Sequence, residues 1–312
     1  MKRIPKSFEE QVRDHWTSER TKKITGGKKY PILPAEGAEL LRALGLLNAD
    51  ASMSADAVRK YTQINHMILL FEPFFLELAE RFSPVRVLDA GCGSSFLTFL
   101  LAWCFQNRWK KKALILGVDS NAAVLEKSRR TAEQLGFSDV LRFEVANLKS
   151  FNWDDCFARV FEQEPKRPNA VIALHACDTA TDMALSVGIL QKADFLGVAP
   201  CCQAELARKW AKLSGENYEG PFAPVFANPN LRRDIAAHFT DALRMLLVRG
   251  AGYEVTTTEF VSSQHSAKNR LITAVRRGNF HTESQAAYGE MKAALGGQGI
   301  LLEEILGKFS GE

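Results

Sequence analysis

Polar side chains that could do chemistry follow an apolar run within residues 172–182, which read IALHACDTATD. Three of them come directly after the apolar residues: His175, Cys177 and Asp178. His175 or Asp178 could remove a proton from an attacking hydroxyl or nitrogen, which is the work of a general base. Asp182 could position that base or cap the following helix, and the capping-box spacing of Thr179 and Asp182 favours the cap.

A second cluster, PCCQAEL, follows the next apolar run and contains the adjacent cysteines Cys201 and Cys202. Three roles are open for this pair. Free cysteines pack as small apolar side chains, whereas a thiolate can act as a catalytic nucleophile. Together with His175 and Cys177 the pair would also offer ligand types that suit zinc. The spacing matches no zinc-binding motif, so we expect no metal.

A glycine turn joins a strand to a helix in VLDAGCGSSF, residues 87–96. Gly91 and Gly93 let the backbone approach a ligand at the helix N-terminus. A dinucleotide site would need a third glycine where Phe96 stands. Asp89 would repel a phosphate, but it suits a ligand with an ammonium group, such as the methionine end of S-adenosylmethionine.

Two further polar residues follow the next two apolar runs. Asp119 ends the run ALILGVD, where its carboxylate is placed to accept both ribose hydroxyls of an adenosine. Asn147 follows the run after that, in EVANL. A glycine turn alone is weak evidence, but the turn with these acids and this amide forms a coherent ligand-binding set.

Short apolar runs alternate with amphipathic segments from about residue 81 onward. We predict strands at residues 85–89, 113–119, 141–146, 170–175 and 193–199. Uniformly apolar strands separated by helices indicate a parallel sheet covered on both faces. Two last runs, YEVTTTEFV and RLITAVR, are close enough to pair antiparallel. The predicted fold class is therefore α/β, a Rossmann-like doubly wound sheet of seven strands, mostly parallel with the last strand antiparallel. Both polar clusters then lie at carboxyl ends of central strands, where ligands bind in such sheets.

Three parts are expected: a helical, basic N-terminal extension (1–80), the sheet domain (81–277) and a helical C-terminal tail (278–312). Residues 1–30 carry nine basic and four acidic side chains, net +5, whereas the whole chain has a net charge of +4. This asymmetry is consistent with contact with an anion such as nucleic acid, although a solvated basic segment is an equal alternative.

Bulk composition is that of an ordinary globular protein, with 46% hydrophobic and 24% charged residues. No apolar run is long enough to span a membrane, and no secretory signal precedes the first strand. The six cysteines form no C-x-x-C pair and do not resemble a disulfide framework. We therefore expect a cytoplasmic protein with no membrane partner.

The motifs VLDAGCG, GVDSN and VANL resemble the ligand-binding motifs of class I S-adenosylmethionine-dependent methyltransferases. The resemblance covers about residues 81–277 and implies that the chain is an enzyme whose cofactor is S-adenosylmethionine. It further implies a division of labour in cofactor binding: the methionine moiety held by Asp89, Gly91, Cys92 and Gly93, the ribose by Asp119 and Ser120, and the adenine by Asn147 and Leu148.

LHACDTATD and APCCQAEL together resemble a narrower subgroup, the methyltransferase-domain-32-like proteins and the tRNA 2′-O-ribose methyltransferases. Asp178 departs from these relatives, which usually have glycine there. The zinc module that the eukaryotic tRNA enzymes carry near their N-terminus is also missing. The resemblance implies an RNA substrate, tRNA or rRNA, methylated at a ribose 2′-hydroxyl or a base.

Further residues are expected to face this substrate: Cys177, Lys268, Asn269 and Arg270. The last three precede the final strand and could contact a phosphate, although such loops are polar anyway. Two other functions are open. The chain could methylate a small molecule or a protein side chain, or it could be a non-catalytic S-adenosylmethionine-binding protein that associates with RNA or ribosomes.

Overall fold

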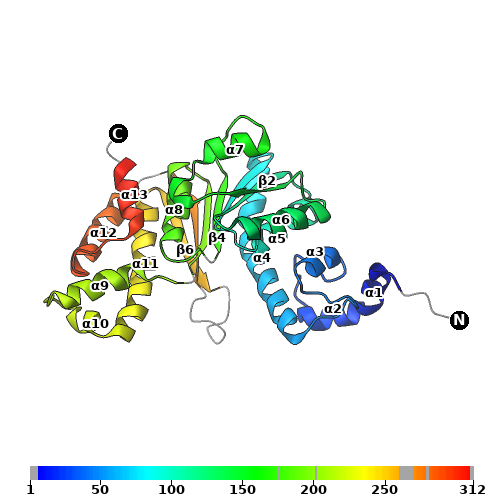
Figure 1. Ribbon diagram of the computed structural model, residues 1–312, viewed down its shortest axis with the longest axis horizontal. Coiled ribbons are helices and arrows are strands. Elements are labelled where there is room, and N and C mark those ends of the chain that lie inside the picture. Colours follow the sequence, from blue (N-terminus) through cyan, green and yellow to red (C-terminus); the bar gives the residue numbers. More distant parts are fainter. Residues whose placement is uncertain (1–5, 175, 201, 260–269, 279–280, 310–312) are drawn as a thin grey trace. The chain divides into compact units, whose positions relative to one another are not determined.

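The computed structural model describes residues 6–174, 176–200, 202–259, 270–278 and 281–309 (Figure 1). Seven strands form one sheet in the order β3-β2-β1-β4-β5-β7-β6. Their bounds are β1 Val85–Ala90, β2 Ala113–Asp119, β3 Leu141–Val145, β4 Ala170–Leu174, β5 Phe195–Ala199, β6 Tyr253–Glu259 and β7 Arg270–Arg276. β4 pairs in parallel with β1 and β5, whereas β7 runs antiparallel to β5 and β6. The predicted α/β, Rossmann-like fold with an antiparallel last strand is confirmed.

The strands lie where the apolar runs predicted them because these runs are buried along their length. All five residues of β5 are buried, as are four of the five in β4. The register places Leu174 opposite Ala199. The chain segments that leave β4 and β5 therefore start side by side, which brings the two polar clusters of the sequence to one edge of the sheet.

The chain divides into two compact units. The first contains residues 1–85, 93–117 and 121–143, and the second contains residues 86–92, 118–120 and 144–312. Helical elements of the first unit are α1 Phe8–His15, α2 Ser18–Thr25, α3 Ala38–Ala43, α4 Ala55–Arg81, α5 Phe96–Trp103, the π-helix η1 Cys104–Arg108 and α6 Ala122–Gln134. Those of the second unit are the 3-10 helix η2 Leu148–Ser150, α7 Trp153–Phe161, α8 Thr179–Leu190, α9 Glu205–Gly215, α10 Ala223–Ala227, α11 Pro229–Gly250, α12 Thr282–Ala294 and α13 Leu301–Phe309.

The first unit is built around the long helix α4, whose N-terminus is capped by Ser54. Phe75 of α4 lies edge-on to Phe105 of η1, with ring centroids 5.6 Å apart, and Trp109 lies edge-on to Phe105 at 4.8 Å. The indole of Trp109 donates a 2.7 Å hydrogen bond to Glu72 of α4. Aromatic packing thus secures α4, and the predicted helical character of the N-terminal region is confirmed.

In the second unit, α8 and α11 pack near β4 to β7, and α12 and α13 pack on these two helices (Figure 1). Gly188 allows the close approach of α8 to the sheet, because a Cβ there would lie 2.3 Å from a methyl carbon of Leu196 on β5. The hydroxyl of Tyr253, the first residue of β6, donates a 2.9 Å hydrogen bond to the Ala193 carbonyl. None of the described helices is long and apolar enough to cross a membrane.

Candidate functional site

The glycine turn follows directly from β1. Asp89, the penultimate residue of β1, is 2% exposed. Gly91 and Gly93 adopt φ angles of 70° and 52°, in the left-handed region that favours glycine. The N–H groups of Gly91 and Cys92 donate to the Val118 carbonyl at 2.8 and 3.0 Å, which ties the turn to the end of β2. A buried carboxylate therefore lies next to a turn that is held in one conformation.

The ends of β2 and β3 are joined in the same way. The carbonyl of Asp119, the last residue of β2, accepts a 3.0 Å hydrogen bond from the N–H of Ala146. Asn147 is exposed, and its side-chain oxygen accepts from the N–H of Lys149, the middle residue of η2. The other two predicted cofactor residues are Ser120, which is exposed, and Leu148, which is half-buried. The structure thus brings the predicted methionine, ribose and adenine residues of the second unit to adjoining strand ends.

Asp178 lies in the turn between β4 and α8 and links this turn to the segment after β5. Its N–H donates to the Cys202 carbonyl at 2.7 Å. One carboxylate oxygen accepts from the N–H groups of Ala204 and Glu205, both at 2.9 Å, so Asp178 caps the N-terminus of α9. The other oxygen accepts from Arg208 at 2.7 Å.

The backbone of Asp178 is unusual for a residue with a side chain, with φ 54° and ψ −120°. Only glycine adopts such angles without strain, and strain of this kind costs about 1–3 kcal/mol. The glycine expected here from the resemblance would adopt these angles without strain, because it has no side chain. Burial acts to raise the pKa of Asp178, but hydrogen bonds from Arg208 and from the backbone outweigh it, and the pKa is lowered. The carboxylate is therefore ionised, and its hydrogen bonds connect the turn between β4 and α8 to the N-terminus of α9.

A buried ion pair lies directly behind this turn. Asp182 and Arg244 are 0% and 1% exposed, and they form two hydrogen bonds of 2.9 and 3.0 Å. Arg244 also donates to the carbonyl of Asp178 at 2.8 Å. Asp182 does not cap α8, whose N-terminus has no side-chain cap. That prediction was wrong because Arg244, 62 residues away in sequence, takes both carboxylate oxygens.

The ion pair continues into a network through Asp241, which is 3% exposed. Asp241 accepts from Gln203 at 2.9 Å and from Arg270 at 2.8 Å, and it lies 3.4 Å from Arg244. Arg270 also contacts a ring nitrogen of His238 at 3.1 Å. Sequence reasoning missed this network, although one signal was present. Asp241 and Arg244 lie three residues apart on a helix, among the buried apolar residues of DALRMLLV.

The remaining predicted residues fall into two groups. Cys177 is exposed and Cys202 is half-buried. Four lie outside the described residues: His175, Cys201, Lys268 and Asn269. Across the described ranges no group of three His, Cys, Asp or Glu side chains could hold a metal ion. Because two residues of the zinc hypothesis are outside those ranges, that hypothesis stays untested.

The methyltransferase-domain-32 family model, described as a methyltransferase domain, matches residues 59–209, just under half of the chain. Residues 59–209 are thus similar to a methyltransferase domain, and this match supports an enzyme. The solved structures that are similar to this chain include a methyltransferase crystallised with S-adenosylhomocysteine and with S-adenosylmethionine. The narrower resemblance to tRNA 2′-O-ribose methyltransferases stays a prediction.

A curated relative from Mus musculus, a glutathione S-transferase C-terminal domain-containing protein, is 26% identical over 154 residues, which make up 49% of this chain. The matched part spans only 20% of that relative. A magnesium protoporphyrin IX methyltransferase from Synechocystis PCC 6803 has 17% identity and a TM-score of 0.40, with 77% of this chain and 93% of that one covered. The N-terminal domain of human METTL16 has 12% identity and a TM-score of 0.42, with 78% and 80% covered. These structural likenesses are too distant to inform the substrate.

Proposed function

We propose that the whole chain is a cytoplasmic enzyme that transfers the methyl group of S-adenosylmethionine to RNA, tRNA or rRNA. The leading acceptor is a ribose 2′-hydroxyl, with a base as the alternative. The observation that carries the proposal is the line of polar strand ends in the second unit. β1 carries a buried acid near its end and is followed by a glycine turn, an acid ends β2, an amide follows β3, and the Asp178 turn follows β4.

The chemistry of these residues fits the parts of S-adenosylmethionine. The carboxylate of Asp89 would pair with the ammonium group, and the left-handed turn at Gly91 and Gly93 would leave room for the methionine chain. Asp119 would accept the ribose hydroxyls. The amide nitrogen of Asn147 is available for the adenine, because the side-chain oxygen already accepts from Lys149. When bound, S-adenosylmethionine supplies an electrophilic methyl group on a sulfonium ion.

On the acceptor side, we assign different work to His175 and Asp178. His175 is the proposed base that removes the proton of the attacking hydroxyl. Asp178 is a positioning residue in this scheme, since its oxygens are taken by Arg208 and by the N-terminus of α9. It fixes the segment that carries Cys202 against the turn that carries Cys177. We assign Cys201 and Cys202 to packing around the acceptor, although a thiolate nucleophile remains the alternative.

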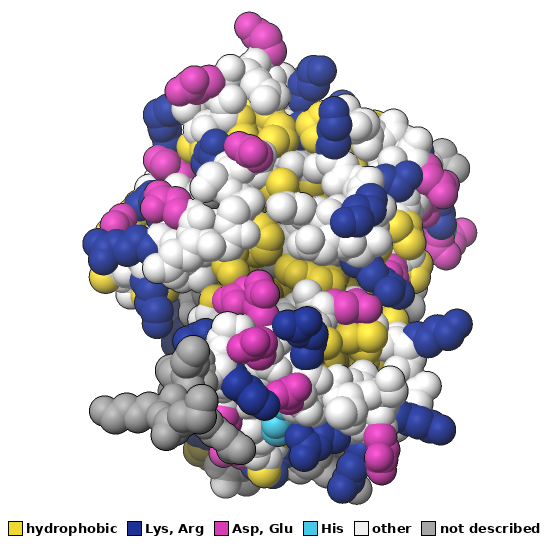
Figure 2. All heavy atoms as spheres, turned by 90° about the vertical axis from the view of Figure 1, so that its right-hand side faces the viewer, with side chains coloured by type: hydrophobic (Ala, Val, Ile, Leu, Met, Phe, Trp, Pro, Cys, Tyr) yellow, Lys and Arg dark blue, Asp and Glu magenta, His cyan; other side chains and the backbone are white. Residues whose placement is uncertain are grey.

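Exposed cations on α9, which Asp178 caps, and on the neighbouring α11 support RNA as the substrate. Arg208 of α9 is 64% exposed and touches Asp178, and Lys212 follows one turn later. α11 packs on α9 and carries the exposed Arg233. Such side chains suit phosphate contacts. On the face drawn in Figure 2, by contrast, Lys and Arg alternate with Asp and Glu, so that face carries no patch of one sign.

The test follows tritiated S-adenosylmethionine into the RNA, protein and small-molecule fractions of an extract from cells that lack the gene. Label in RNA with the wild type and Glu133→Gln, but not with Asp89→Asn, is the expected result. Glu133 is an exposed acid of α6 outside the site, which makes it a matched control. Digestion to nucleosides then identifies the methylated atom. Label confined to protein or small molecules would overturn the RNA assignment, and cofactor binding without any labelled fraction would overturn catalysis.

The division into residues 1–80, 81–277 and 278–312 also stays a proposal. The family model begins at residue 59 and ends at residue 209, so it includes part of α4 and omits β6 and β7. Limited proteolysis followed by mass spectrometry would locate the boundaries. Cleavage near residues 80 and 277 is the expected result, and cuts confined to other positions would contradict it.

A further inference from the structure

The C-terminal helices cover a pocket at the opposite end of β5 from Cys202. Its walls come from the last turns of α8 and α11, from α12 and from α13, all in the second unit. Arg276 and Tyr253, which pair at the ends of β7 and β6, line one end. The cavity volume is about 690 Å³. That volume lies within the range of small-molecule sites, which is about 300–1,000 Å³.

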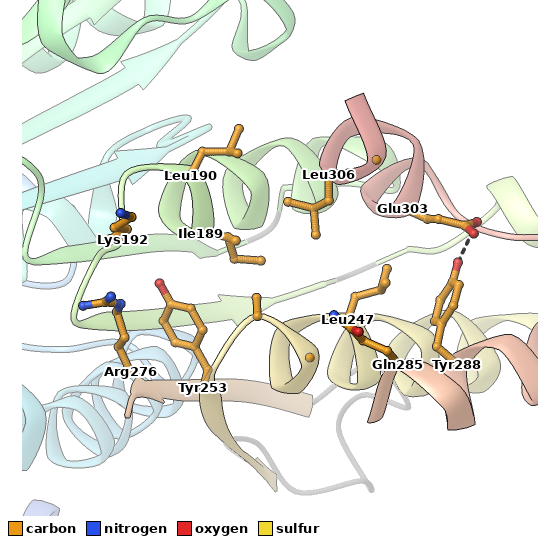
Figure 3. A pocket seen from close by; sticks show the side chains of 13 residues that line it. Ile189, Leu190, Lys192, Leu247, Tyr253, Arg276, Gln285, Tyr288, Glu303 and Leu306 are labelled. Carbon is orange, nitrogen blue, oxygen red and sulfur yellow. Dashed lines mark hydrogen bonds between the residues drawn. The ribbon is translucent and has the colours of Figure 1, made fainter. Parts of the chain in front are cut away.

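Two basic side chains lie at this end. Figure 3 shows the polar groups of Lys192, Arg276 and Tyr253 at one end of the pocket. Lys192 and Arg276 are exposed, and no ion pair among the described residues includes either of them. The neighbouring carboxylate of Asp194 is bound to Arg167 at 3.0 Å. Two cations at this end thus lack a carboxylate partner within the described structure.

The middle of the pocket is apolar. Ile189 and Leu190 of α8 and Leu306 of α13 lie on one side of it, and Leu247 of α11 lies on the other (Figure 3). Leu190 is 39% exposed, and within the described ranges only three large hydrophobic side chains are exposed. An apolar ligand chain along this wall would remove that surface from water, which is favourable by about 25 cal/mol per Å².

The far end of the pocket carries an acid that is already paired. Glu303 accepts a 2.9 Å hydrogen bond from the hydroxyl of Tyr288, drawn as a dashed line in Figure 3, and it forms a 2.7 Å ion pair with Lys292. Its charge is therefore compensated, and the pocket has an uncompensated cationic end and a long apolar wall.

We propose that this pocket binds a carboxylate with a long unbranched apolar chain. The carboxylate lies between Lys192 and Arg276, and the chain lies along Leu190 toward Leu306. The inference is independent of the methyl-transfer proposal, because none of the residues of that site lines the pocket. The two helices that line the pocket also carry the buried ion pair, since Arg244 precedes Leu247 by about one turn of α11 and Asp182 lies in the first turn of α8. Ligand binding should therefore stabilise the fold as well.

The experiment is a calorimetric titration of the full chain with dodecanoate below its micelle-forming concentration. Dodecyltrimethylammonium, which has the same chain and the opposite charge, serves as the probe control. Arg276→Gln should weaken dodecanoate binding about tenfold or more, because a charge-assisted hydrogen bond contributes about 1.4 kcal/mol or more. Arg277→Gln is the matched variant control, since the adjacent Arg277 pairs with Glu254 on the exposed surface. Leu190→Gln, at an exposed position, should also weaken binding without unfolding the chain.

Several results would overturn the proposal. One is the absence of saturable heat when dodecanoate is titrated into the wild type, and another is binding at many sites, as a detergent binds. Equal binding of the cationic probe would show that the cations do not select the ligand. Equal losses in Arg276→Gln and Arg277→Gln would place the carboxylate elsewhere. Because the titration needs neither S-adenosylmethionine nor RNA, its failure is distinguishable from failure of the methyltransferase proposal.

Discussion

Replacement of Asp89 by asparagine should selectively weaken binding of the methionine end of S-adenosylmethionine. The substitution keeps the shape of the side chain and removes its negative charge. Asp89 is 2% exposed, so solvent screens its charge very little. A hydrogen bond to a charged group contributes about 1.5–3 kcal/mol, and each 1.4 kcal/mol changes a dissociation constant tenfold. We therefore expect about a tenfold to hundredfold loss of affinity, nearer the upper value because of the burial.

The assay compares two ligands by calorimetry. S-adenosylhomocysteine carries the ammonium group, whereas methylthioadenosine has the same adenosine without the amino acid. Asp89→Asn should weaken the first and leave the second nearly unchanged. Asp119→Asn, at the proposed ribose contact, should weaken both by a similar factor. Thermal unfolding of each variant controls for loss of structure.

Two outcomes would refute this reasoning. If Asp89→Asn weakened both ligands equally, Asp89 would act on the adenosine or on the fold, and the assignment to the ammonium group would fail. If it weakened neither ligand by more than about threefold while the chain stayed folded, the glycine turn would not be the methionine site.

Other predictions concern the loops behind the site. Arg244→Met leaves the charge of Asp182 buried without its partner and should lower the free energy of unfolding by about 3–5 kcal/mol, measured with urea; a loss below about 1 kcal/mol would contradict this. Asp178→Gly should be more stable than Asp178→Ala by about 1–2 kcal/mol, because the backbone conformation at this position strains alanine but not glycine. Asp178 has a lowered pKa, so its stabilising effect is present at neutral pH and is lost as the pH falls through that pKa; the gap in unfolding free energy between wild type and Asp178→Asn should shrink in acid. If RNA is the substrate, its affinity should fall steeply with salt, and Arg233→Gln should flatten that slope by about one unit.

The strands and the glycine turn followed from local sequence. Short, uniformly apolar runs that alternate with amphipathic helices are typical of strands in a sheet covered on both faces. The strand positions were therefore predictable to within a residue or two, as at β1 and β2. The same holds for the positive φ angles of Gly91 and Gly93, because the turn between a strand and a helix at this point needs residues without a side chain. The division of the strand-end residues among parts of the cofactor came from resemblance to a family, and it still awaits its test.

Partners distant in sequence decided the rest. Asp182 has the local spacing of a capping residue, yet its oxygens are bound by Arg244, and no short-range pattern contains that pairing. The sequence offered Asp178 as a candidate general base, but the segment after β5 and Arg208 of α9 both bind its carboxylate. The pocket likewise exists only because α12 and α13 pack over the ends of α8 and α11. Sequence by itself therefore determined which segments are strands and where polar groups follow them, because burial and backbone conformation are local demands. Only the tertiary structure decided which charge meets which, because a buried charge takes whichever opposite charge the packing of helices brings within hydrogen-bond distance.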